Sequence, residues 1–220
     1  VGMIRLIEAC KEFRRGRKVV RILDEVTADF RADVALGVLA RPGQGKSTLA
    51  QILCGAKTLD AGAIERTSAI SFPLGYAGWL TYELTAAENI AFMARLYGRD
   101  VDEMIDAVFG FAEVRRGADE PLRYTTPVHR TKIAYGVSFM LDFDIQLVDE
   151  AIGVGDVRFR AKCLQMLQDK AQKAGVIAMG SNWTVLDRFC DAAATLHRGQ
   201  IEFFPTLQEA ADYLNRIAPE

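Results

Sequence analysis

The sequence predicts an α/β domain, and three observations point to that fold class. Short apolar runs alternate with amphipathic stretches, as expected where buried strands feed helices. One apolar run leads directly into a glycine-rich loop and then into the start of a helix. Another apolar run ends in two adjacent carboxylates, at the end of a strand where ligands of α/β sheets bind. A chain of 220 residues that is 50% hydrophobic is large enough to bury such a core.

Strands are expected where short apolar runs lie between turn residues. Between Thr85 and Leu141 apolar residues recur at helical spacing instead, which predicts a helical lobe inserted between two halves of a sheet. Arg198–Gln200 separates two apolar runs and predicts a hairpin turn, and Thr206 with Glu209 predicts a capping box that opens the last helix. The expected strands are Met3–Ile7, Val26–Phe30, Val34–Leu39, Ala69–Phe72, Ile145–Val148, Val176–Met179, Ala193–Leu196 and Ile201–Phe204.

Composition excludes some classes of partner. The 27 Lys and Arg residues nearly balance the 29 Asp and Glu residues, and a net charge of -2 argues against a nucleic-acid partner. The four cysteines have no C-x-x-C or zinc-like spacing, which favours a reduced, cytoplasmic protein. No apolar run approaches the roughly 18 residues of a membrane span, so any membrane role is expected to come from a partner.

The sharpest motif is a phosphate-binding loop at Ala40–Thr48, with the sequence ARPGQGKST. A buried strand precedes it and a helix follows it, in the order that this motif requires. Gly43 and Gly45 allow the backbone N–H groups of the loop, including those of Gln44 and Thr48, to turn around a phosphate. Lys46 supplies positive charge, and the Ser47 hydroxyl is a ligand for Mg²⁺. The alternative is an ordinary turn before a helix.

Ala40 departs from the motif, because the first position of this loop is normally glycine. If that position requires a positive φ, alanine there costs on the order of 1 kcal/mol or more. If it does not, the substitution is harmless.

Asp149 and Glu150 end the apolar run that begins at Ile145. In the catalytic interpretation, Asp149 holds the Mg²⁺ shell and Glu150 orients or deprotonates the attacking water. In the alternative, the two carboxylates are a solvated cap at the end of a strand. Their position about a hundred residues after the phosphate-binding loop favours the catalytic interpretation.

With these motifs placed, the chain resembles the ATP-binding subunits of ABC transporters, and within that class those of the capsular polysaccharide exporters. The resemblance spans nearly the whole chain and is more specific than the phosphate-binding loop alone. It is carried by Ser71–Gly78, Leu84–Asn89, Ala94–Gly98, Phe139–Asp144, Val148–Glu150, Val154–Asp156, Arg158–Phe159, Cys190–Asp191 and the closing helix.

The resemblance implies a P-loop NTPase fold of ABC type, with a central, mostly parallel sheet, flanking helices, an N-terminal antiparallel β part and the inserted helical lobe. One nucleotide-binding domain would span residues 1–220, with its core at about 1–82 and 143–220 and its lobe at about 83–142. ATP and Mg²⁺ would be the ligands. Phe13 would stack on adenine, although packing at a sheet edge is the alternative for that ring. Asp156 would communicate across a dimer.

The resemblance also implies an assembly. The chain would lie in the cytoplasm, peripheral on the inner face of the cell membrane, beneath a separate membrane-spanning permease. It would pair head to tail with a second ATP-binding subunit, as a homodimer or a heterodimer, so that each ATP lies between one P-loop and the signature segment of the other subunit.

Besides Ala40, three motifs depart from the family pattern. Thr81 stands in place of the glutamine that senses Mg²⁺ and the attacking water. The signature begins at Thr125 and carries Pro127 in place of a glycine whose N–H faces the γ-phosphate, and proline has no N–H. Ser181 stands where the switch histidine is expected. The loop, Lys46, Ser47 and Asp149 remain, so ATP binding is expected to persist while hydrolysis becomes very slow.

Three functions therefore remain open from the sequence. The first is an energy-coupling ATPase subunit for capsular-type polysaccharide export, with attenuated hydrolysis. The second is a pseudo-ATPase that binds nucleotide to organise or regulate an export assembly without turnover. The third, a P-loop kinase, is the weakest, because the acidic pair followed by Asp156 suits hydrolysis across a dimer and no arginine-rich lid is found.

Overall fold

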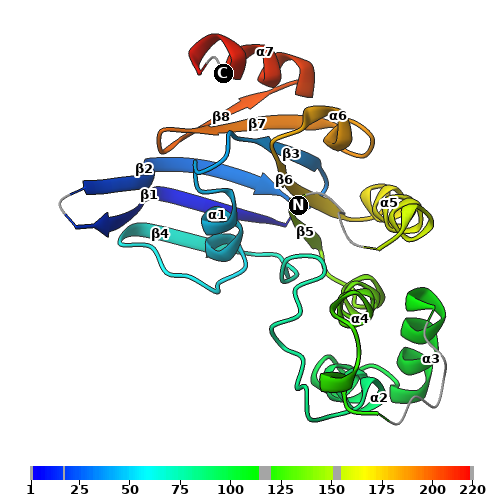
Figure 1. The fold of residues 1–220 in the computed structure, drawn as a ribbon. Coiled ribbons are helices and arrows are strands. Elements are labelled where there is room, and N and C mark those ends of the chain that lie inside the picture. Colours follow the sequence, from blue (N-terminus) through cyan, green and yellow to red (C-terminus); the bar gives the residue numbers. More distant parts are fainter. Residues whose placement is uncertain (1, 17, 114–119, 151–154, 219–220) are drawn as a thin grey trace. The chain divides into compact units, whose positions relative to one another are not determined.

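The computed structural model describes residues 2–16, 18–113, 120–150 and 155–218. The chain divides into two compact units, one of Val1–Pro73, Phe143–Ala151 and Leu167–Glu220, and one of Leu74–Asp142 and Ile152–Met166. The first unit contains all the named strands, and the second contains helices α2, α3 and α4 (Figure 1).

Two sheets form the first unit. The antiparallel sheet has the order β2-β1-β4, with β1 at Met3–Arg15, β2 at Lys18–Arg31 and β4 at Ala61–Arg66. The second sheet has the order β5-β6-β3-β7-β8, and only the β7–β8 pair is antiparallel. Its strands are β3 Ala35–Leu39, β5 Ile145–Asp149, β6 Gly175–Gly180, β7 Ala192–His197 and β8 Gln200–Phe204. These two sheets confirm the expected mostly parallel sheet and N-terminal antiparallel part.

One hydrophobic core joins both sheets through helix α1, Lys46–Leu53. Leu49 and Ile52 of this helix are fully buried in a cluster that also contains Leu6 of β1 and Val38 of β3. Every residue of β3 is buried, as the uninterrupted apolar run predicted. The core therefore fixes both the strand that enters the phosphate-binding loop and the helix that leaves it.

The expected strand at Ala69–Phe72 is wrong. Only Ile70 forms an isolated parallel bridge, with Ile145. The Ser71 hydroxyl accepts from the Leu147 N–H at 2.9 Å, which replaces a backbone acceptor and interrupts the ladder. Pro73 follows and has no N–H to continue it. Conversely, the strand β4 was not predicted from the sequence, because its side chains are mostly exposed and it lacks a continuous apolar run.

The predicted hairpin turn near the C-terminus is present, but the capping box predicted at Thr206 and Glu209 is only half formed: the Glu209 carboxylate accepts from the Thr206 hydroxyl at 3.1 Å instead of from the Thr206 N–H. Arg198 and Gly199 both have positive φ, 48° and 82°, as a two-residue hairpin between β7 and β8 requires. Helix α7, Leu207–Ile217, begins at the N-cap Thr206, whose hydroxyl accepts from the Glu209 N–H at 3.2 Å. Helix α5, Val157–Ala171, precedes β6, and the short helix α6, Trp183–Leu186, follows it.

The second unit is helical, which confirms the helical pattern expected between Thr85 and Leu141. Among the described residues, its helices are α2 Ala86–Leu96, α3 Val101–Ala112, α4 Pro127–Met140 and the Val157–Met166 part of α5, with a 3₁₀ turn η1 at Leu122–Tyr124. Thr85 and Glu88 form a capping box at the start of α2. Phe111 packs against Phe139 and Phe159, with ring centroids 5.3 and 5.5 Å apart.

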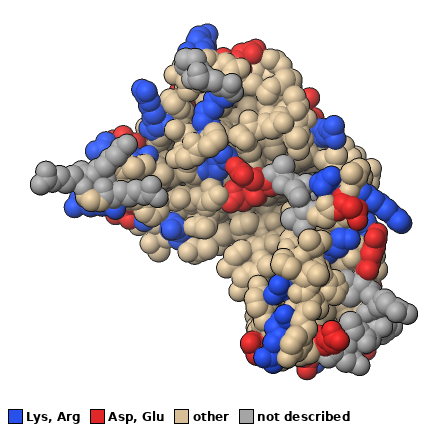
Figure 2. Space-filling model, viewed as in Figure 1, with Lys and Arg blue, Asp and Glu red and all other residues tan. Residues whose placement is uncertain are grey.

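Charged side chains of both signs are interspersed on the face drawn in Figure 2, in keeping with the near balance of basic and acidic residues. Within the described ranges, no helix combines the length and the apolar character that crossing a bilayer demands.

Candidate functional site

The phosphate-binding loop has the backbone geometry that its glycines predict. Gly43 and Gly45 adopt φ of 81° and 103°, and Gly45 is the N-cap of α1. A Cβ on Gly45 would lie 2.4 Å from Cγ2 of Ile22, so a larger residue does not fit there. Because the first N–H groups of a helix lack intrahelical partners, the loop and the start of α1 present donors and a positive dipole end to an anion.

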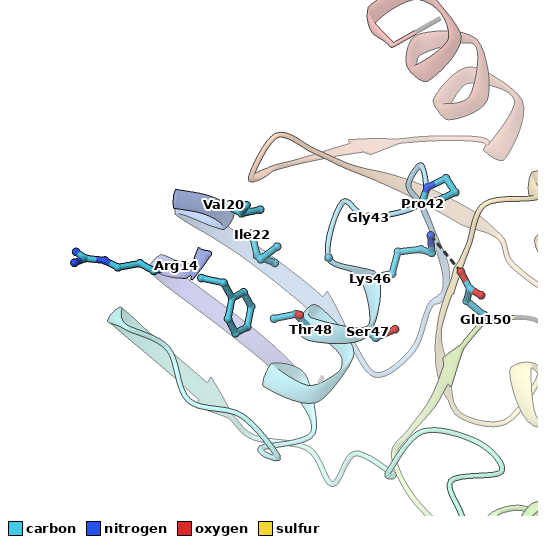
Figure 3. A pocket seen from close by; sticks show the side chains of 11 residues that line it. Arg14, Val20, Ile22, Pro42, Gly43, Lys46, Ser47, Thr48 and Glu150 are labelled. Carbon is cyan, nitrogen blue, oxygen red and sulfur yellow. Dashed lines mark ion pairs between the residues drawn. The ribbon is translucent and has the colours of Figure 1, made fainter. Parts of the chain in front are cut away.

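A pocket of about 760 Å³ lies in front of this loop, within the first unit. It is lined by the loop on one side and by the β1–β2 hairpin on the other (Figure 3). Its lining includes the predicted ligands Phe13, Gly43, Gly45, Lys46, Ser47, Thr48 and Glu150, together with Arg14, Val20, Ile22 and Pro42.

Arg14, Val20 and Ile22 were missed by the sequence analysis, because the first strand was expected to end at Ile7 and the second to begin only at Val26. Val20 pairs with Phe13 across the β1–β2 hairpin, and Ile22 lies two residues further along β2. The alternation of Val20 and Ile22 with charged Arg21 is the signal that could have extended β2 and identified this wall.

Lys46 is buried, with a side chain only 6% exposed, and has two partners in this structure. Its Nζ donates to the Ala40 carbonyl oxygen at 3.1 Å and lies 3.3 Å from Glu150 Oε1 (Figure 3). Ala40 is not among the described residues with positive φ, so alanine at this position carries no backbone strain. Of the two alternatives for Ala40, the structure supports the harmless one.

Ser47 lines the pocket and is hydrogen-bonded to Asp149, which is not itself a lining residue. Burial raises the pKa of Asp149, and a hydrogen bond with the Ser47 side chain partly opposes that rise. Asp149 Oδ1 is buried and has no hydrogen-bond partner. A hydroxyl and a carboxylate with an unpaired buried oxygen fit the oxygen ligands that Mg²⁺ prefers.

Glu150 occupies a strained backbone position at φ 61°. Its N–H donates to the Met179 carbonyl at 2.9 Å, which completes the pairing of Asp149 with Met179 in the β5–β6 ladder. Its side chain is 62% exposed and reaches back into the pocket toward Lys46. A non-glycine residue in the left-handed region is uncommon and is often found at functional sites.

Phe13 presents part of its ring to the pocket and is 37% exposed. The ammonium groups of Lys57 and Lys11 lie 5.0 and 5.6 Å from its centroid. Gln44, a further predicted ligand, is also absent from the pocket lining, because its Oε1 accepts from the Arg198 N–H at 2.9 Å.

The positions that break the family pattern are divided between the two units. Ser181 is exposed in the first unit, directly after β6, and lines a separate cavity of about 270 Å³. In the second unit, Thr81 donates its N–H to Asn89 Oδ1 at 2.7 Å. Thr125 Oγ1 donates to the Leu122 carbonyl, and Pro127 is the first residue of α4, where a missing N–H does not disturb the helix.

Asp156 lies in the second unit and is exposed. Its carboxylate accepts from the Phe159 N–H at 2.9 Å, and this hydrogen bond is the main reason that its pKa is lowered. Val154, which precedes it in the motif noted above, lies outside the described residues.

Comparison with known proteins places these features in context. The chain is 32% identical over 215 residues to the polysialic acid transport ATP-binding protein KpsT of Escherichia coli, covering 96% of this chain and 98% of that protein. It is 30% identical over 213 residues to the ATP-binding protein BexA of Haemophilus influenzae, covering 97% and 98%. It is also 30% identical over 204 residues to the capsule polysaccharide export ATP-binding protein CtrD of Neisseria meningitidis serogroup B, covering 93% and 94%. No family model matches the chain.

The fold is similar to that of solved ATP-binding cassettes. A dimeric, post-hydrolysis structure of the cassette MJ0796 bound to ADP and Pi superposes with a TM-score of 0.77 at 18% identity, covering 93% of this chain and 98% of that one. The structural likeness and the sequence relatives therefore agree on the type of fold.

Proposed function

Because the chain belongs to the family of ATP-binding subunits of ABC transporters that export capsular polysaccharides, we propose that it binds Mg-ATP and serves such an exporter while hydrolysing ATP very slowly. It would work in the cytoplasm, on the inner face of the cell membrane, with a membrane-spanning permease. A second ATP-binding subunit, either another copy or an intact homologue, would face its P-loop.

One observation carries the proposal of ATP binding. The positive-φ glycines, the start of α1 and the buried ammonium of Lys46 converge on a single pocket, whose opposite wall contains the ring of Phe13. Backbone N–H groups and the ammonium suit phosphates, and a half-exposed aromatic ring suits a purine. The pocket volume of about 760 Å³ is within the range typical of small-molecule sites.

Ser47 and Asp149 are the residues that would hold Mg²⁺. The ion would supply charge neutralisation at the phosphate oxygens. Glu150 would orient or deprotonate the attacking water, as the residue next in sequence to the metal ligand. Its ion pair with Lys46 would be exchanged for the interaction of Lys46 with phosphate when nucleotide binds.

Slow hydrolysis follows from the three substituted positions. A single preorganised donor to developing charge contributes roughly 10²- to 10³-fold in rate. Thr81 lacks the amide of glutamine, Pro127 lacks an N–H, and Ser181 lacks an imidazole. Ground-state binding through Lys46 and the loop amides does not depend on these groups, so affinity would persist where turnover is lost.

The test is to measure Mg-ATP affinity and steady-state hydrolysis with the purified chain. We expect saturable binding and turnover well below about 1 per second. A variant that combines Thr81→Gln, Pro127→Gly and Ser181→His should raise turnover by at least about 100-fold with little change in affinity. Ordinary turnover by the unmodified chain would refute attenuation, and absence of binding would refute the function.

A further inference from the structure

Two side chains of the phosphate-binding loop point away from the nucleotide pocket. Pro42, Gly43, Gly45 and the residues after it line that pocket, but Arg41 and Gln44 do not. Arg41 instead lines the smaller cavity of about 270 Å³, together with Asn215 of α7. Both loop side chains make hydrogen bonds to the last part of the chain, so the loop has partners that its motif does not account for.

Arg41 connects the loop to the C-terminal end of α7. Its Nη2 donates to Asn215 Oδ1 at 2.8 Å and to the Ala218 carbonyl at 3.3 Å. Ala218 is the C-cap of α7, where carbonyl oxygens lack intrahelical partners and where a cation interacts favourably with the helix dipole. The guanidinium therefore both pairs with a carbonyl at the end of α7 and interacts favourably with the helix dipole. Its hydrogen bond to Asn215 joins residues 174 positions apart in sequence.

The peptide group that precedes Arg41 also orients Lys46. The N–H of Ala40 donates to the Gly180 carbonyl at 3.1 Å, and the carbonyl of Ala40 accepts from Lys46 Nζ at 3.1 Å. That carbonyl belongs to the peptide bond between Ala40 and Arg41. A restraint on Arg41 is therefore a restraint on the group that holds the ammonium of Lys46.

Gln44 holds the opposite side of the loop. Its Oε1 accepts from the Arg198 N–H at 2.9 Å, in the turn between β7 and β8. The two contacts, from Arg41 and from Gln44, thus reach one continuous segment, β7–β8–α7.

We propose that the β7–β8–α7 segment is a brace that positions the phosphate-binding loop for the triphosphate, and that Arg41 and Asn215 are the positioning residues that connect them. The proposal rests on the proposed function, because it concerns the affinity of the same loop for Mg-ATP. A loop held in its binding conformation loses less conformational freedom when the ligand arrives, and this raises affinity.

The test compares the affinity for Mg-ATP of the parent chain, Arg41→Ala, Asn215→Ala and the double variant, by isothermal titration calorimetry. We expect each single substitution to raise Kd about 3- to 10-fold. The double variant should be no weaker than Arg41→Ala, because the two substitutions remove the same contact. Asn215→Asp, which keeps an acceptor in the same position, should retain the parent affinity, an outcome that general damage to α7 does not predict.

Arg216→Ala is the matched control, since this neighbouring side chain of α7 lies 5.7 Å from the Tyr213 ring. It should leave Kd unchanged. If the parent chain binds Mg-ATP and Arg41→Ala binds it equally well, the brace is wrong. If the parent chain does not bind, the proposed function fails instead. Should Arg41→Ala fail to fold by circular dichroism, Asn215→Ala decides alone, because Asn215 is exposed.

Discussion

Gly45→Ala is expected to damage both folding and ATP binding, for two separable reasons. The backbone φ of 103° is a conformation that alanine adopts only at a cost. In addition, the new Cβ would lie 2.4 Å from Cγ2 and 3.0 Å from Cδ1 of Ile22, a buried residue of the facing wall. Gly43→Ala provides a matched control, because its φ is 81° but no atom lies within 4 Å of the added Cβ.

The two contributions have known sizes. A residue held in a sparsely populated backbone region costs on the order of 1–3 kcal/mol. Overpacking of a close-packed site costs a further 1–3 kcal/mol or so. Gly43→Ala should therefore lose about 1–3 kcal/mol of unfolding free energy, and Gly45→Ala about 2–6 kcal/mol. For a chain of this size, each kcal/mol lowers Tm by about 2–4 °C.

Urea unfolding of both variants, with Mg-ATP titration of whichever remains folded, measures these quantities. The difference between the two variants isolates the clash with Ile22. Ile22→Ala removes Cγ2 and Cδ1, so a double-mutant cycle with Gly45→Ala should show favourable coupling of about 1–3 kcal/mol. Equal stability of Gly45→Ala and Gly43→Ala, or zero coupling to Ile22, would refute the role assigned to this wall.

Three further predictions follow from the structure. Asp149→Asn should raise the Tm of the nucleotide-free chain, because burial raises the pKa of Asp149 and the folded state therefore disfavours its charge. It should also remove the Mg²⁺ dependence of ATP binding, because Asp149 is a proposed Mg²⁺ ligand. The contribution of Asp149 to stability falls as pH rises from its ordinary value of 3.8 through the raised value, so the Tm advantage of the variant should grow in that direction; a constant advantage would contradict this. Phe13→Ala should raise Kd for Mg-ATP about ten-fold or more through lost stacking, whereas Phe203→Ala, which removes an exposed ring outside that pocket, should not; a loss of stability with unchanged affinity would favour simple packing for Phe13. Thr206→Ala should lower the unfolding free energy by about 1 kcal/mol through loss of the α7 N-cap, and Thr206→Ser should restore it; equal stability of all three chains would show that the cap contributes nothing.

The sequence determined the strand–loop–helix order around Lys46 and the acidic end of β5, because local rules govern both. Apolar runs without interruption become buried strands, and glycines at fixed spacing allow a turn that other residues resist. The same rules failed in two segments, one predicted as a strand that does not form and one strand that was not predicted. The Ser71 hydroxyl interrupts the strand expected at Ala69–Phe72, and β4 carries mostly exposed side chains.

The pocket likewise combines residues that local sequence patterns predicted with residues that they did not. The residues of the loop and Phe13 of the facing wall were predicted by number, but the rest of that wall was not, because Ile22 enters the pocket through the pairing of β1 with β2. Whether alanine at position 40 strains the backbone could not be decided from the sequence, because the answer depends on its φ. The ion pair of Lys46 with Glu150 and the tether from Arg41 to Asn215 join residues more than a hundred positions apart.

By itself, the sequence thus determined the strand–loop–helix motif and predicted which groups bind phosphate, metal and base, since that chemistry belongs to residue types at short spacing. Only the tertiary structure decided what surrounds these groups, because distant segments meet through burial of a shared core rather than through any local signal.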